Sequence, residues 1–311
     1  MNIRIGTRSS PGALWQAHFV RAALLKVDEE LDVEIVKLPA EGENAPADGS
    51  TDGSPTEPAT HHADHALVNG DVEVVVQRLQ DVPTDLVGGV ELAAIPCRQD
   101  PADGLISQKD RCLRDFPQGA MVLTGSPRRR AELLNARPDL DIRPVQGDIP
   151  GRIKKMRQGH AQAVVVACAG LCRMGMAHVV SERLDPERFV PAAGQGAIAV
   201  ECRKDDPVIR RLCAAIDDPE TRLTATAERS FMRVLGIHYH MPAGTYARTS
   251  PGNGRIRLIG LIAEPDGSRV LRGEVSGQVE GLAGAAELGQ DLAEQLQRRG
   301  CDEILKMTRR T

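Results

Sequence analysis

Residues 2–38, NIRIGTRSSPGALWQAHFVRAALLKVDEELDVEIVKL, decide the fold of this chain. A short strand-like run at 2–8 is followed by a longer segment with helical character and then by a second strand-like run at 33–38. Ser10 and Pro11 form a good N-cap and first-turn pair for the helix between the two runs. The stretch therefore predicts a strand–helix–strand unit, from which α/β domains are built.

The same alternation continues along the chain, and its character changes near residue 219. Further strand-like runs are VEVVV (72–76), DIRPV (141–145), AVVVAC (163–168) and IAVEC (198–202). After them come a helix pattern at 221–235, strand-like runs at 255–263 and 270–277, and a final helix pattern from Leu282 to Arg299. We therefore expect α/β domains with largely parallel or mixed sheets, followed by a small C-terminal α+β domain.

Composition excludes several classes of protein. The 311 residues are 41% hydrophobic and carry a net charge of −4, which gives no general attraction to nucleic acid or to an anionic membrane. No apolar run approaches the ~18 residues of a membrane span, and the first residues do not resemble a signal peptide. Seven scattered cysteines do not form a disulfide framework in a chain of this length. We expect a cytoplasmic protein with reduced thiols.

Two polar segments lie side by side in the sequence. Residues 41–60 are rich in Gly, Pro, Ser, Thr, Asp and Glu, without an apolar period, and predict a mobile loop. The following HHADH places His61 and His65 one helical turn apart, which is metal-ligand spacing, with His62 between them. Because the sequence fixes no third ligand, we interpret this segment as an exposed polar helix face and expect no metal.

Arginines at the ends of predicted elements form the main chemical pattern. Arg8 ends the first strand, directly before the capped helix, and a helix N-terminus beside an arginine suits an anion. In TGSPRRR (124–130), Thr124 and Ser126 precede a helix whose first turn holds Arg128 and Arg129. Cations there oppose the helix dipole, so carboxylate binding explains them better than stability does. We expect Arg128→Ala to weaken ligand binding with little change in melting temperature.

Three further residues extend this pattern. Arg152 and Arg173 follow predicted strands, and Asp81 follows the 72–76 strand directly before Pro83. Open α/β sheets bind ligands outside the carboxyl ends of their strands. Two domains facing each other would therefore line one cleft with arginines, suited to a small polycarboxylate, although Arg152 and Arg173 could also be ordinary surface residues. By itself Asp81 is equally consistent with a turn or capping residue.

Eight motifs, in this order, resemble those of the porphobilinogen deaminase (hydroxymethylbilane synthase) family: GTRSSPGALWQAH, QDVP, TGSPRRR, GDIPGR, CAGLCRMG, PAAGQGA, VECR and TAERSFMR. The resemblance implies two related α/β domains similar to periplasmic binding proteins, at 1–96 with 197–214 and at 102–190, and a C-terminal α+β domain at 219–311. It implies a catalytic Asp81 that handles protons, and a usually monomeric protein. Residues implied to bind the carboxylates of a pyrrole-like substrate are Arg8, Ser10, Thr124, Ser126, Arg128, Arg129, Arg152 and Arg173.

The departures from the family cluster at the site. QRLQDVP stands where the family has HSMKDVP, so that Gln80 replaces a basic residue and Arg78 a serine. RGN becomes Gln146-Gly147-Asp148, and the chain has no lysine between Lys37 and Lys109. In GIHYHMPAGTYA (236–247), Tyr239 occupies the position of the cysteine that holds the family's dipyrromethane. A phenol is a poor nucleophile beside a thiol, so we expect no covalent cofactor, dipyrromethane included.

Three hypotheses follow. The first is an enzyme repurposed to act on porphobilinogen or a related aminomethyl or polycarboxylate substrate through Asp81, by C–N cleavage with loss of ammonia or by condensation. The second is a non-catalytic homologue that binds a pyrrole, a tetrapyrrole or a protein partner. The third is a true hydroxymethylbilane synthase with its primer held without a covalent bond or attached elsewhere. Of these, the sequence favours the first.

Overall fold

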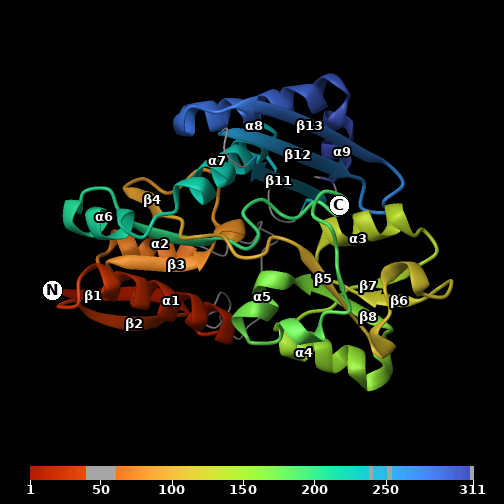
Figure 1. The fold of residues 1–311 in the computed structure, drawn as a ribbon, viewed down its shortest axis with the longest axis horizontal. Helices are drawn as coiled ribbons and strands as arrows, with labels where there is room; N and C mark the ends of the chain where they lie inside the picture. Colours follow the sequence, from red (N-terminus) through yellow and green to blue (C-terminus); the bar gives the residue numbers. More distant parts are fainter. Residues whose placement is uncertain (40–60, 238–240, 251–253, 309–311) are drawn as a thin grey trace, which may run out of the picture. The chain divides into compact units, whose positions relative to one another are not determined.

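The computed structural model describes residues 1–39, 61–237, 241–250 and 254–308. It divides into two compact units, Met1–Cys97 with Ala197–Asp218, and Arg98–Gly196 with Pro219–Thr311. Figure 1 labels the elements along the chain. The mixed α/β fold and the small C-terminal region of sheet and helices are confirmed. The three domain boundaries expected from the sequence stay a prediction.

The first unit is a five-stranded sheet in the order β2-β1-β3-β10-β4. Its strands are β1 (Asn2–Arg8), β2 (Asp32–Leu38), β3 (Val74–Arg78), β4 (Val90–Ala94) and β10 (Ile198–Arg203). Strands β1, β2 and β3 are parallel, whereas β10 runs antiparallel to both β3 and β4. The helices are α1 (Pro11–Val27), α2 (His61–Val68) and α6 (Pro207–Ala214).

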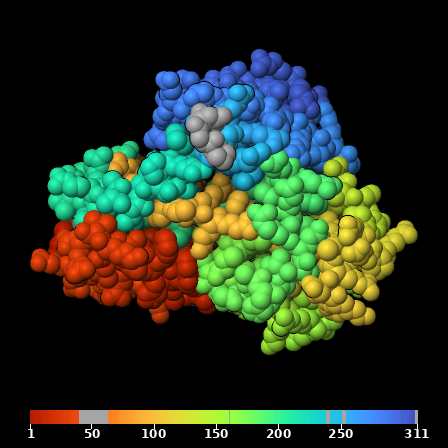
Figure 2. Space-filling model, viewed as in Figure 1, coloured from red at the N-terminus to blue at the C-terminus, as the bar shows by residue number. Residues whose placement is uncertain are grey.

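Side chains alternate along β3 to bury both faces of this sheet. Val74 and Val76 pack into the core that contains α1 and α6, whereas Val75 packs against α2. This two-sided burial explains why the predicted strand at 72–76 is an almost unbroken apolar run. Figure 2 shows the residues of β1, α1 and β2, in red, packed closely together.

The second unit contains a five-stranded sheet of matching pattern, in the order β7-β6-β8-β5-β9. Its strands are β5 (Asp103–Ser107), β6 (Met121–Leu123), β7 (Asp141–Arg143), β8 (Ala163–Ala167) and β9 (Glu182–Arg183). Strands β6, β7 and β8 are parallel, and β5 is antiparallel to β8 and β9. The helices α3 (Pro127–Ala136), α4 (Ile149–Lys155) and α5 (Cys168–Arg173) accompany this sheet.

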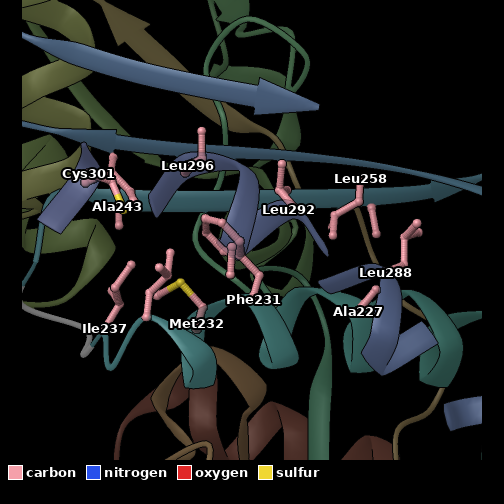
Figure 3. Close-up of a cluster of buried hydrophobic side chains, with 14 of the residues drawn as sticks. Ala227, Phe231, Met232, Ile237, Ala243, Leu258, Leu288, Leu292, Leu296 and Cys301 are labelled. Atoms are coloured by element: carbon pink, nitrogen blue, oxygen red, sulfur yellow. The ribbon is translucent and has the colours of Figure 1, made fainter. Parts of the chain in front are cut away.

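The same unit also contains the C-terminal sheet, a meander of β11 (Ala243–Thr249), β12 (Arg255–Ala263) and β13 (Val270–Gln278). Its helices are α7 (Pro219–Val234), α8 (Gly281–Arg298) and α9 (Cys301–Thr308). Alternate residues of β12 face two cores. Leu258 packs with Phe231 and Leu292 of α7 and α8, as Figure 3 shows, whereas Ile259 packs with Ala131 of α3.

Close packing of α7 against α8 depends on a glycine. A Cβ at Gly289 would meet the carbonyl oxygen of Ala227 and the side chain of Ser230. We therefore expect Gly289→Ala to lower the free energy of unfolding by about 1–3 kcal/mol, because helix backbone would have to shift. Gly284→Ala in the same helix is the control, since its Cβ would make ordinary contacts at 3.7 Å from Val279 and alanine favours a helix. Chemical denaturation compares the stabilities of the two variants, and equal denaturation midpoints would contradict the expectation.

Candidate active site

Asp81 lies at the carboxyl end of β3, in the short 3₁₀ turn Leu79–Asp81. Its Oδ2 atom accepts a hydrogen bond from Nη2 of Arg8 at 3.0 Å and another from Nε of Arg78 at 2.7 Å. The side chain of Asp81 is 7% exposed, so this charged group is largely withdrawn from water. The structure thus places the aspartate at a strand end, as expected, and gives it two cationic partners.

Strand pairing explains why Arg8 reaches Asp81. Strand β1 lies parallel to β3, with Ile5 opposite Val74, so their carboxyl ends lie at the same edge of the sheet. Arg8 is the last residue of β1. Ser10 then caps α1, its hydroxyl oxygen accepting from the backbone N–H of Ala13 at 3.3 Å, and Pro11 begins the helix. The predicted cap is confirmed.

In the second unit, Thr124 and Ser126 precede a helix as expected, and Ser126 is its N-cap. Ser126 caps α3, its hydroxyl oxygen accepting from the N–H of Arg129 at 3.4 Å. The hydroxyl oxygen of Thr124 accepts from the N–H of Ser126 at 3.3 Å. Both side chains therefore order the turn that leads from β6 into α3.

Arg128 and Arg129 bind carboxylates that belong to the protein itself. Nη2 of Arg128 lies 2.8 Å from Asp103, and Nη1 lies 2.7 Å from Glu132, one turn further along α3. Arg129 contacts the other oxygen of Asp103 at 2.8 Å. The side chain of Arg128 is only 3% exposed. The carboxylates that offset these cations in the first turn of the helix are thus internal, and substrate binding by Arg128 and Arg129 stays a prediction.

The pKa values of the two buried acids in this cluster, Asp103 and Glu132, shift in opposite directions. Burial by itself raises the pKa of Asp103, but attraction to Arg128 and Arg129 outweighs it and lowers the pKa to about 2. Burial raises the pKa of Glu132 to about 7, and Arg128 opposes this only in part. Glu132 also accepts a hydrogen bond from the N–H of Val190, at 2.5 Å.

The raised pKa of Glu132 predicts a pH dependence of stability. Between about pH 4.5, its pKa in the unfolded chain, and about pH 7, the folded protein retains a proton that the unfolded chain releases. The free energy of unfolding should therefore fall through this interval, by on the order of 3 kcal/mol. The difference between wild type and Glu132→Gln in urea titrations at several pH values isolates this contribution. A pH-independent difference would contradict it.

Arg173 and Arg152 make different contacts in the second unit. Arg173 is buried at the end of α5, and donates from Nε to the side chain of Gln99 at 2.6 Å and from Nη2 to the carbonyl of Gly196 at 2.9 Å. Arg152 lies inside α4, not directly after a strand, and its Nε donates to the carbonyl of Gly147 at 2.7 Å. Substrate binding by both arginines stays a prediction.

The predicted site residues fall into two sets. Arg8, Ser10 and Asp81 belong to the first unit, and Arg8 and Asp81 are in direct contact there. Those in the second unit are Thr124, Ser126, Arg128, Arg129, Arg152 and Arg173. A common cleft for both sets stays a prediction.

The partners of these residues were not predicted from the sequence. In the sequence, Arg78 was noted only as a departure from the family. Because it lies three residues before Asp81, a contact between the two side chains within one turn could have been predicted. Asp103 was missed because it is far from α3 in sequence, and only the fold brings it to Arg128. Glu132 could have been found, since it lies four residues after Arg128 on one helix face.

Several expectations concern residues outside the described part of the chain. These are the mobile loop 41–60 and the loop around His238, Tyr239 and His240. Ile237, which precedes them, is buried in the C-terminal core. HHADH begins α2, as expected, and among the side chains that the structure describes no three His, Cys, Asp or Glu gather as a metal site would require. Within the same residues, no helix is long and apolar enough to cross a membrane.

Fold and site together define an α/β protein with two five-stranded mixed sheets and a carboxylate held by arginines at a strand end. Two family models match the chain: "Porphobilinogen deaminase, dipyromethane cofactor binding domain" over residues 3–211, and "Porphobilinogen deaminase, C-terminal domain" over residues 222–298. The chain belongs to the porphobilinogen deaminase family.

Named relatives match over almost the whole chain. The porphobilinogen deaminase of Pelobacter propionicus is 36% identical over 304 residues, which cover 98% of this chain and 96% of that protein. The porphobilinogen deaminase of Thermus thermophilus is 36% identical over 307 residues, 98% of each chain. Among solved structures, a putative methionine-binding lipoprotein of Bacillus subtilis shares 14% identity with a TM-score of 0.44, covering 71% of this chain and 92% of that one.

These matches correct two expectations. The expectation of no dipyrromethane is wrong, because the family model matching residues 3–211 describes the domain that binds this cofactor. It rested on a single position, Tyr239, whereas the match extends over most of the chain. The matches also give no support to a repurposed substrate, and they favour the alternative of a hydroxymethylbilane synthase.

Proposed function

We propose that this protein is a hydroxymethylbilane synthase, which joins porphobilinogen units with loss of ammonia into a linear tetrapyrrole and uses a dipyrromethane to do so. The observation that carries the proposal is the match of both family domains, at 3–211 and 222–298, to a chain that retains Asp81 beside Arg8. Its relatives of similar length are porphobilinogen deaminases.

The donor groups of the chain fit a cofactor and a substrate that carry several carboxylates. Arg8 and Arg152 are partly exposed, and the capped N-terminus of α3 presents backbone N–H groups. Such donors bind carboxylates through charge-assisted hydrogen bonds. Buried Arg128 also has an Nε–H with no acceptor among the described residues. We assign the binding of these carboxylates to Arg8, Arg128 and Arg152, together with Arg129 and Arg173. When bound, the dipyrromethane would supply the pyrrole carbon to which new units are added.

Asp81 suits the proton and charge movements of this reaction. The aminomethyl group of porphobilinogen reacts as its ammonium form: the carbon–nitrogen bond breaks, nitrogen keeps the bonding pair and leaves as ammonia, and the positive charge passes to the pyrrole. A largely buried carboxylate stabilises that charge more strongly than one in water. After the new carbon–carbon bond forms, the same carboxylate can accept the proton lost from the attacked pyrrole carbon.

The test is to incubate the purified protein with porphobilinogen and follow three signals. Ammonia and linear tetrapyrrole, measured as porphyrin after chemical ring closure and oxidation, should appear together. Mass spectrometry of the protein and its peptides should detect the dipyrromethane and locate its attachment. Ammonia without tetrapyrrole would instead support a repurposed enzyme, and absence of both from a protein that holds dipyrromethane would refute the proposed activity.

A further inference from the structure

Arg78 contacts the oxygen of Asp81 that Arg8 also contacts. Its Nε and Nη2 atoms both lie 2.7 Å from Oδ2, while Nη2 of Arg8 lies 3.0 Å from the same atom. Arg78 is the last residue of β3 and Asp81 ends the turn that follows it. One carboxylate oxygen is therefore contacted both by Arg78, which directly precedes the turn of Asp81, and by Arg8 of the neighbouring strand β1.

Arg78 adds a second cation to a carboxylate that Arg8 already contacts. The side chain of Arg78 is 48% exposed, whereas that of Asp81 is 7% exposed, so a half-exposed guanidinium pairs with a largely buried carboxylate. With Arg8 already on Oδ2, Arg78 makes a further contact to the same atom. Two arginines on one oxygen of the proposed catalytic group point to a role in the reaction.

Neighbouring side chains in the segment QRLQD do not supply this contact. Gln77 is buried and donates to Glu201 at 2.6 Å, and Leu79 is buried in the core. Gln80 is neutral, so Arg78 carries the only positive charge of the segment. Two nitrogens of a planar guanidinium on one oxygen also restrict rotation of the carboxylate, which a single flexible ammonium would do less well.

We infer that Arg78 is a positioning residue, which with Arg8 fixes the orientation of the Asp81 carboxylate for proton transfer; this rests on the proposed synthase function. A positioning role predicts a specific kinetic pattern. Removal of the guanidinium should lower kcat and leave KM for porphobilinogen nearly unchanged, because the substrate still binds while the acceptor of its proton is misplaced. A role in substrate binding would raise KM instead.

The experiment compares Arg78→Ser, Arg78→Lys and wild type in tetrapyrrole formation. We expect Arg78→Ser to lower kcat by about tenfold or more, and Arg78→Lys to recover part of that loss. Arg210→Ser is the matched control: Arg210 is also 48% exposed and pairs with Glu91 in the same unit, at 2.5 Å. It should retain wild-type kcat. Wild-type kcat in Arg78→Ser, or a change in KM alone, would overturn the inference.

Crystal structures of wild type and Arg78→Ser separate this inference from the proposed function. If wild type that holds dipyrromethane forms neither ammonia nor tetrapyrrole, the proposed function fails, and the orientation of Asp81 then decides about Arg78. The inference expects the carboxylate to turn away from Arg8 in the variant. An unchanged Asp81 side chain, still bound to Arg8 as in the wild type, would refute it whatever the activity.

Discussion

Asp81→Asn should reduce tetrapyrrole formation by roughly 10²–10⁴-fold, the range typical for loss of a general acid–base group. The amide keeps the shape of the carboxylate and can still accept a hydrogen bond from Arg8. It carries no negative charge to offset the cation that forms on the substrate, and it cannot take up a proton at neutral pH. The measurement is kcat for porphobilinogen consumption, with ammonia followed in parallel.

Asp85→Asn is the control for this variant. Asp85 is an exposed aspartate that follows Asp81 by four residues, so the substitution removes the same charge nearby without touching the proposed site. It should leave kcat unchanged. If Asp81→Asn kept more than about a hundredth of wild-type kcat, its loss would fall below that range and proton handling would have to be assigned elsewhere.

Arg128→Met should lower the free energy of unfolding by about 3–5 kcal/mol, the usual cost of removing one partner from a buried ion pair. The substitution leaves Glu132 without its cationic partner and leaves Asp103 with Arg129 alone. Arg128, Asp103 and Glu132 are each at most 5% exposed, so water cannot replace the lost contacts. The burial of Arg128 thus reverses the sequence-based expectation of a nearly unchanged melting temperature.

Urea denaturation followed by far-UV circular dichroism measures this effect, with Arg143→Met as the control. Arg143 pairs with Asp141 in the same unit, but its side chain is 61% exposed. An exposed ion pair of this kind contributes little. Similar denaturation midpoints for the two variants would show that the buried cluster does not stabilise the fold.

Much of the fold could be predicted because its signals are local. The Ser10–Pro11 and Ser126–Pro127 pairs begin α1 and α3 where expected, and β3, β8 and β10 coincide closely with their apolar runs. Strands with weak patterns were missed. Strand β6 has only three residues, and β11, with sequence AGTYART, is poor in the large apolar side chains that indicate a strand.

The site was harder to predict because its electrostatics depend on contacts distant in sequence. Asp81 could be placed at a strand end from the sequence alone. Its pairing with Arg8, 73 residues away, requires β1 and β3 to be neighbours in the sheet. The partners of Arg128 show the same dependence on the fold. Its place in the first turn of a helix suggests an external anion, whereas Asp103 provides an internal one.

The position of β10 between β3 and β4 has a consequence for synthesis of the protein on the ribosome. Among the described residues, the first 97 contain four of the five strands of their sheet, and β4 is joined to the others only through β10, which begins at Ile198. Until about two thirds of the chain has emerged, the nascent sheet ends at β3, with an unpaired edge open to other chains. The later-synthesised Arg98–Gly196 segment, which contains every strand of its own sheet, can complete that sheet sooner.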